Sequence, residues 1–131
     1  MANFSIDLNS AITKAKGNVD TVVRKVVLDL GTSIVFGSPV DTGRFRANWQ
    51  YAFGRVPSGT LDVLDKSGQG SIDKINAGLK FTDGIHYLTN NLPYAQRLED
   101  GYSKQAPAGM VGLTILRFSG IVSLAASGVK K

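Results

Sequence analysis

The sequence has 131 residues, which is the usual size of one domain, and it contains no cysteine. This excludes disulfides, thiolate zinc sites, iron–sulfur clusters and cysteine nucleophiles. The formal net charge is +5, but the basic residues are scattered, which favours a solvated surface with weak attraction to polyanions over a dedicated DNA contact.

Neither export nor membrane insertion is indicated by the sequence. Residues 1–9 lack the basic region and apolar core of a signal peptide. The most apolar stretch, residues 110–126, is interrupted by Arg117 and is shorter than the roughly 20 residues that a bilayer requires. We therefore expect one soluble domain over residues 1–131, without membrane contact.

Residues 10–36 predict one long amphipathic helix. Asp20 and Arg24 would form an i,i+4 pair on its polar face. Gly17 and Gly31 weaken the helix and allow a bend or an early end. The apolar positions recur at spacings of three and four: Ile12, Val19, Val22, Val23, Val26, Val27, Leu30 and Ile34.

Residues 45–53 alternate between apolar and polar side chains. A period of two predicts a strand in an antiparallel sheet, with its aromatic face covered by the long helix. That face would carry Phe45, Ala47, Trp49, Tyr51 and Phe53.

An insertion is expected at residues 54–83. Residues 54–70 are rich in Gly, Ser, Pro and Asp, and they predict a long loop. A short helix should follow, with Ser71 as its cap and Asp73 in its first turn.

The last third of the chain predicts one strand and two helices. Residues 84–91 read as the second strand. Pro93 could open a short helix that Gly101 closes, and Pro107 begins a helix running to about Ala126. The expected fold is therefore α+β, with the long N-terminal helix and the C-terminal helix packed on a small antiparallel β-sheet.

The predicted C-terminal helix, residues 107–126, has more apolar surface than one core contact needs. One stripe comprises Val111, Ile115, Phe118 and Val122, and a neighbouring one comprises Met110, Leu113, Ile121 and Leu124. A surface helix of a monomer needs only one apolar stripe. Two interpretations stay open, a central core helix or a helix whose second stripe, around Leu113 and Ile121, faces a neighbouring subunit.

Two features contain residue types that are used in catalysis or metal binding. Asp41-Thr42-Gly43 is the core triplet of aspartic proteases, but Arg44 follows it and no second copy is present. A turn, in which the Asp41 carboxylate accepts backbone amides, explains the triplet better. His86, the only histidine, has no neighbouring ligand pattern, so we expect no metal, no cofactor and no enzymatic activity.

Three segments in fixed order resemble the neck or tail-completion proteins of tailed bacteriophages, the family that includes the lambda-like minor tail protein Z type. They are residues 38–49 (SPVDTGRFRANW), 87–101 (YLTNNLPYAQRLEDG) and 102–110 (YSKQAPAGM). The resemblance covers nearly the whole chain. The residues that match the family's motifs are Asp41, Thr42, Gly43, Trp49, Asn90, Pro93, Tyr94, Ala95, Glu99, Gly101, Pro107 and Met110.

This resemblance implies a virion protein without catalysis. It would form a ring in the neck, with sixfold symmetry as the family expectation, and be found in the host cytoplasm during assembly. The ring would join the DNA-filled head to the tail, or complete the tail's head-proximal end. The implied partners are further copies of the chain, an adaptor or stopper ring, and the tail terminator or tail tube, with non-specific contact to DNA in the lumen.

We interpret the motif residues as architectural. Glycine suits tight turns at Gly43 and Gly101, and proline suits helix starts at Pro93 and Pro107. Trp49 and Tyr94 would be buried anchors, each with one polar atom.

Arg97 and Glu99 could form a rim ion pair that orients a neighbouring subunit. With Leu113 and Ile121, they are the predicted subunit contacts. The alternatives are a small basic nucleic-acid-binding module and an unrecognised hydrolase, which would need a second carboxylate beside Asp41.

Overall fold

The computed structural model describes residues 2–7, 19–106 and 109–129. It has the predicted α+β class. The elements in chain order are β1 (Ala2–Asp7), α2 (Val19–Phe36), α3 (Arg44–Ala47), β2 (Trp49–Phe53), α4 (Gln69–Gly78), β3 (Ile85–Asn90), α5 (Ala95–Glu99), α6 (Val111–Leu116) and α7 (Phe118–Val129).

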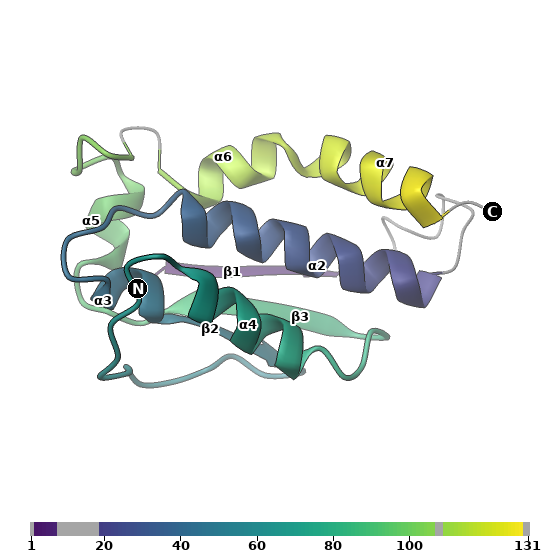
Figure 1. The fold of residues 1–131 in the computed structure, drawn as a ribbon, viewed down its shortest axis with the longest axis horizontal. Helices are drawn as coiled ribbons and strands as arrows, with labels where there is room; N and C mark the ends of the chain where they lie inside the picture. Colours follow the sequence, from purple (N-terminus) through teal and green to yellow (C-terminus); the bar gives the residue numbers. More distant parts are fainter. Residues whose placement is uncertain (1, 8–18, 107–108, 130–131) are drawn as a thin grey trace.

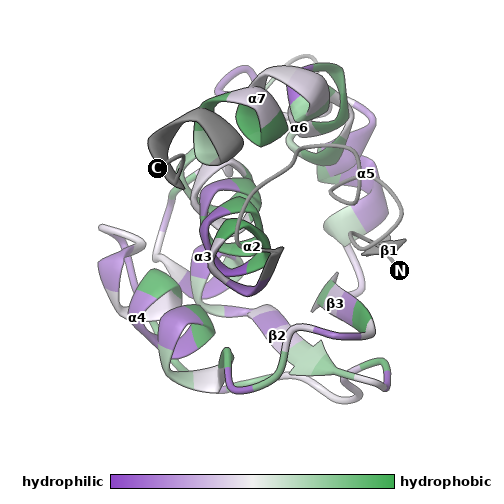
Figure 2. Cartoon of the chain, turned by 90° about the vertical axis from the view of Figure 1, so that its right-hand side faces the viewer, coloured by the Kyte–Doolittle hydropathy of each residue, from purple (hydrophilic) through white to green (hydrophobic). Residues whose placement is uncertain are grey.

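The elements form layers with α2 in the middle (Figure 1). Helices α6 and α7 lie on one side of α2, and the sheet lies on the other, with α4 beside β2 (Figures 1 and 2). The sheet is antiparallel in the order β1-β3-β2, and Asn90 of β3 pairs with Ala2 on one side and Trp49 on the other. Strand β3 agrees with the second predicted strand to within one residue, whereas β1 was not predicted.

Helix α2 supplies more buried hydrophobic side chains to the described core than any other element. It is confirmed from Val19 to Phe36; residues 10–18 of the predicted helix lie outside the described residues. The helix passes through Gly31 without a break, and a Cβ at this position would collide with Ile75 of α4. Glycine therefore allows α2 and α4 to pack closely. The buried side chains of α2 are Val22, Val23, Val26, Val27, Leu30, Ile34 and Val35.

The strand predicted over residues 45–53 is wrong in its first half. Phe45 lies in the short helix α3, and only Trp49–Phe53 is extended. Side chains four residues apart share one face in a helical turn as well as in a strand. Phe45 and Trp49 accordingly meet edge to face, with ring centroids 5.8 Å apart.

The insertion contains the predicted loop and helix, but the helix begins differently. Helix α4 starts at Gln69, its N-cap is Gly68 with φ 82°, and its first turn contains no acidic residue. Ser71 is therefore inside the helix rather than at its cap, and Asp73 lies beyond the first turn. The capping oxygens come instead from Asp65, whose carboxylate accepts the Gly68 and Ser71 amides.

The predicted C-terminal helix is two helices. Helix α6 begins at Val111, and a turn at Arg117 separates α6 from α7. Pro107, the predicted start, lies outside the described residues. The Arg117 amide donates to the carbonyls of both Leu113 and Thr114, at 3.2 and 3.1 Å, which tightens the last turn of α6.

The turn at Arg117 changes which residues share a face, so neither predicted stripe stays intact. The inward side chains, fully or partly buried, are Met110, Val111, Thr114, Phe118, Ile121, Val122 and Ala125, so the predicted stripes lose Ile115 and Leu124 to the exposed side. The large apolar side chains exposed on the outside are Ile115, Leu116 and Leu124.

Candidate functional site

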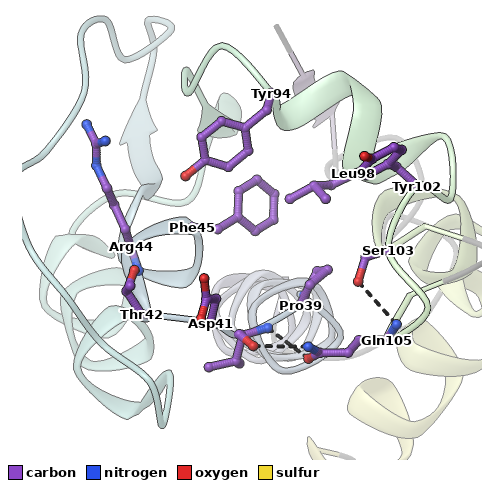
Figure 3. A pocket seen from close by; sticks show the side chains of 12 residues that line it. Pro39, Asp41, Thr42, Arg44, Phe45, Tyr94, Leu98, Tyr102, Ser103 and Gln105 are labelled. Carbon is purple, nitrogen blue, oxygen red and sulfur yellow. Dashed lines mark hydrogen bonds between the residues drawn. The ribbon is translucent and has the colours of Figure 1, made fainter.

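The segments 38–49, 87–101 and 102–110 meet around one hollow, whose volume is about 370 Å³. Residues 39–45 line one side, and Tyr94, Leu98, Tyr102, Ser103 and Gln105 line the other. In Figure 3 the Phe45 ring lies between Tyr94, Leu98 and Pro39. The hollow is the clearest candidate site in the described part of the chain.

The wall formed by residues 38–49 is fixed by side chains that bond to loop atoms. The Trp49 indole donates to Ser38 Oγ at 2.8 Å, and this hydroxyl donates to the Ile34 carbonyl at 2.7 Å. The Arg46 guanidinium donates to the carbonyls of Phe36, Ser38 and Lys66, at 2.9, 3.1 and 2.8 Å. Trp49 is thus a buried anchor with its polar atom satisfied, as predicted.

The Asp41-Thr42-Gly43 turn requires glycine at position 43. Its φ is 91°, and a Cβ there would collide with the backbone of Asp65 and Lys66. The predicted bonds from backbone amides to Asp41 are not what fixes this turn. Thr42 Oγ1 accepts the Arg44 amide instead, at 3.3 Å. The exposed Asp41 carboxylate forms no hydrogen bond or ion pair within the described residues.

Gln105 joins the third segment to the first. Its side-chain oxygen accepts the Val40 amide at 2.9 Å, and its side-chain nitrogen donates to the Val40 carbonyl at 3.0 Å. Figure 3 shows this pair of bonds closing one end of the hollow. Sequence reasoning missed this role, although Gln105 lies in the resemblance segment 102–110.

Helix α5 and the turn after it form the other wall. The predicted closure is confirmed: Gly101 has φ 91°, and its amide donates to the Leu98 carbonyl at 3.1 Å. Helix α5 begins at Ala95, two residues after Pro93. The Arg97 guanidinium carbon lies 5.2 Å from the centroid of the Tyr102 ring, a cation–π contact.

Glu99 has a role that the sequence did not predict. Its carboxylate accepts the amides of Met110, Val111 and Gly112, at 3.0, 2.9 and 2.9 Å, and so caps the start of α6. Gly109, with φ 79°, leaves room for Glu99 at this point. The rim ion pair predicted between Arg97 and Glu99 is absent from the described residues, because each side chain has a different partner.

The other two predicted subunit contacts, Leu113 and Ile121, are only partly exposed to a neighbouring subunit. Leu113 and Ile121 are half-buried, and Ile121 packs against the core. Tyr94 is not the buried anchor that was predicted, because 37% of it is exposed. Its ring packs on Phe45, with centroids 6.1 Å apart, and it also lines the open hollow.

Asp65 organises the start of α4 and was not singled out by sequence. Its carboxylate accepts the Ser71 amide and hydroxyl, at 2.7 and 2.8 Å, and the Gly68 amide at 3.1 Å. Burial alone would raise the pKa of Asp65, but the bonds from Ser71, Gly68 and Ser67 outweigh burial and lower it below the ordinary value.

His86 is buried in β3 with a partner on each ring nitrogen. Nδ1 lies 2.6 Å from the Tyr51 hydroxyl, and Nε2 lies 3.2 Å from the Thr82 carbonyl. Burial also raises the pKa of Tyr51 to about 12, so the phenol stays protonated at neutral pH and can donate to His86. Because both ring nitrogens have partners within the fold, we interpret His86 as a structural histidine.

The described residues hold no group of three or more histidine, aspartate or glutamate side chains that could bind a metal ion. Asp41 is the only carboxylate among the described residues that line the hollow, so no second carboxylate for an aspartic-protease pair is found there. In the described part of the chain, no helix is long and apolar enough to cross a bilayer.

The comparisons with known proteins leave this geometry as the main guide to function. No protein-family model matches the chain, and neither a curated protein nor a solved structure matches it.

Proposed function

We propose that this chain is a non-enzymatic structural subunit of the neck of a tailed bacteriophage. Copies of it form a ring, with six subunits as the family expectation, that completes the head-proximal end of the tail and joins it to the head. Its partners are further copies, an adaptor or stopper ring, and the tail terminator or tail tube. It is part of the virion and is found in the host cytoplasm during assembly.

The observation that carries this proposal is that residues 39–45 and residues between 94 and 105, which are far apart in the sequence, meet around the hollow. Residues that match the family's motifs have structural roles here. Trp49 anchors a loop, Gly101 closes α5, and Glu99 caps α6. A joint built this way holds backbone segments at fixed angles, which suits a protein whose task is to present surfaces to neighbours.

A second support is the unused apolar surface of the C-terminal helices. Leu116 and Leu124 are 80% and 75% exposed, on elements whose inner faces already pack on α2. Clustered exposed apolar side chains are typical of protein–protein contacts. A neck subunit needs at least two such contacts, one with each neighbour in the ring.

The test is genetic and is read out on particles. Phage lacking the coding sequence should accumulate full heads and separate tails, and the chain supplied in trans should restore joining and infectivity. In complemented particles, a tagged chain should form a ring at the neck by electron microscopy. Joined, infectious particles without the chain would refute the proposal, and scattered single copies would refute the ring.

The nucleic-acid-binding module remains the alternative, and the net charge of +5 is the observation that keeps it open. We expect the isolated protein to bind DNA weakly, without sequence preference, and less as salt rises. Submicromolar, sequence-selective binding at physiological salt would favour the alternative.

A further inference from the structure

The hollow beside Asp41 has the properties of a socket for one apolar side chain. Its floor is the buried Phe45 ring, and its walls include Tyr94 and Tyr102, which are 37% and 72% exposed. Aromatic rings left this open are frequent anchors in protein–protein contacts.

The rim of the hollow carries a free negative charge. The Asp41 carboxylate is exposed and has no partner within the described residues. Arg44 also lines the hollow, but in Figure 3 its guanidinium extends away from Asp41. An incoming apolar side chain followed by a cation would therefore match both the floor and the rim.

The same chain carries such a pair at the corner between α6 and α7. Leu116, 80% exposed, has the largest exposed fraction among the large apolar side chains described. Arg117 follows it in the turn and is also exposed; its guanidinium donates one long hydrogen bond, 3.5 Å to Ser33 Oγ. Figure 2 shows hydrophobic residues on α6 and α7 as well as on α2.

We propose that the hollow of one copy receives the α6–α7 corner of a second copy, with Leu116 against Phe45 and Tyr94 and with Arg117 beside Asp41. Socket and corner are different surfaces of one chain, so the contact is heterologous and propagates until a ring closes. The inference deepens the proposed ring and rests on it for the biological setting, but the contact itself can be tested with the purified chain.

The absence of cysteine makes cross-linking specific. A chain with both Asp41→Cys and Arg117→Cys should give, under mild oxidation, a ladder that ends at the closed ring. Chains with one of these substitutions should give only dimers when mixed. The matched control replaces Asp41→Cys with Asp73→Cys, since Asp73 is exposed on α4, away from the hollow. Cross-linking no greater than in this control at any concentration up to the solubility limit overturns the contact.

Charge reversal gives an independent readout by sedimentation. Asp41→Lys or Arg117→Glu should each weaken self-association roughly tenfold or more, and the two together should restore it. Failure of the double variant to recover would overturn the Asp41–Arg117 pairing. Ladders from the purified chain combined with normal particles lacking it would overturn only the neck function. A neck ring without Asp41–Arg117 cross-links would overturn only this contact.

Discussion

Helix α2 and the α6–α7 pair are both rich in apolar residues, yet they use them differently. In α2 the large side chains Val22, Val26 and Ile34 are fully buried. In α6 and α7, Leu116 and Leu124 are mostly exposed, although the inner faces of these helices also pack on α2. The sequence shows a polar face on the first segment and a second apolar stripe on the last, but it does not reveal which residues of that stripe are buried and which are exposed.

The largest expected effect lies in α2. Ile34→Ala should lower the free energy of unfolding by about 2–5 kcal/mol, because it removes fully buried methyl groups from a packed core. Urea denaturation followed by circular dichroism measures the change. Leu124→Ala, on the exposed side, is the control and should change stability little. Similar losses of unfolding free energy in both variants would contradict the proposed difference between the helices.

The next effect concerns the joint that attaches α6. Glu99→Ala should cost about 1–3 kcal/mol, because three backbone amides lose their acceptor. Hydrogen exchange at residues 110–112 should rise more than exchange within α2. Asp100→Ala is the matched control, since its side chain is exposed and accepts a hydrogen bond from Gln96 at 3.1 Å. Unchanged protection at residues 110–112 would contradict the capping role.

A smaller, pH-dependent effect is expected at Asp65. Asp65→Asn should cost about 1–2 kcal/mol at neutral pH, since an amide replaces a carboxylate that accepts several hydrogen bonds. The pKa of Asp65 is lowered by folding, so its contribution is present above the ordinary carboxyl pKa and is lost as pH falls through the folded value.

The stability difference between wild type and Asp65→Asn should therefore shrink in acid, below the ordinary pKa of 3.8. Urea midpoints measured from neutral pH down to pH 3 and below would follow it, with Asp62→Asn as an exposed control. A difference that grows on acidification would have the wrong sign for this mechanism.

Two elements with local sequence signals were predicted well. The spacing of valines in Val19–Phe36 indicates the helix, and Ile85–Asn90 is extended where the second strand was expected. Strand β1 was missed because its pairing depends on β3, which is distant in sequence. The error over residues 45–53 arose because Phe45 and Trp49 satisfy strand and helix spacing alike.

The candidate site was predicted only in outline. The motif segments identified its walls, and glycine chemistry correctly indicated the turns at Gly43 and Gly101. The bonds that close the site join residues far apart in sequence, such as Val40 to Gln105. Local sequence patterns carry no information on such pairs, and they also assigned Glu99 to a rim rather than to a helix cap.

The smallest effect on stability is expected at the corner between α6 and α7. Leu116→Ser should change the free energy of unfolding by no more than about 0.5 kcal/mol, because a side chain that is 80% exposed loses little burial. The same substitution should strongly reduce self-association, since the polar side chain cannot fill the aromatic hollow beside Asp41. Ser119→Ala, an exposed change on α7 one turn away, is the control for both measurements. A large loss of stability would mean that Leu116 packs within its own chain and that the corner is part of the core, like α2. Unchanged stability together with unchanged self-association would instead mean that Leu116 is exposed but takes no part in the subunit contact. Only the combination of intact folding and lost association fits a side chain kept outside the core for a neighbour.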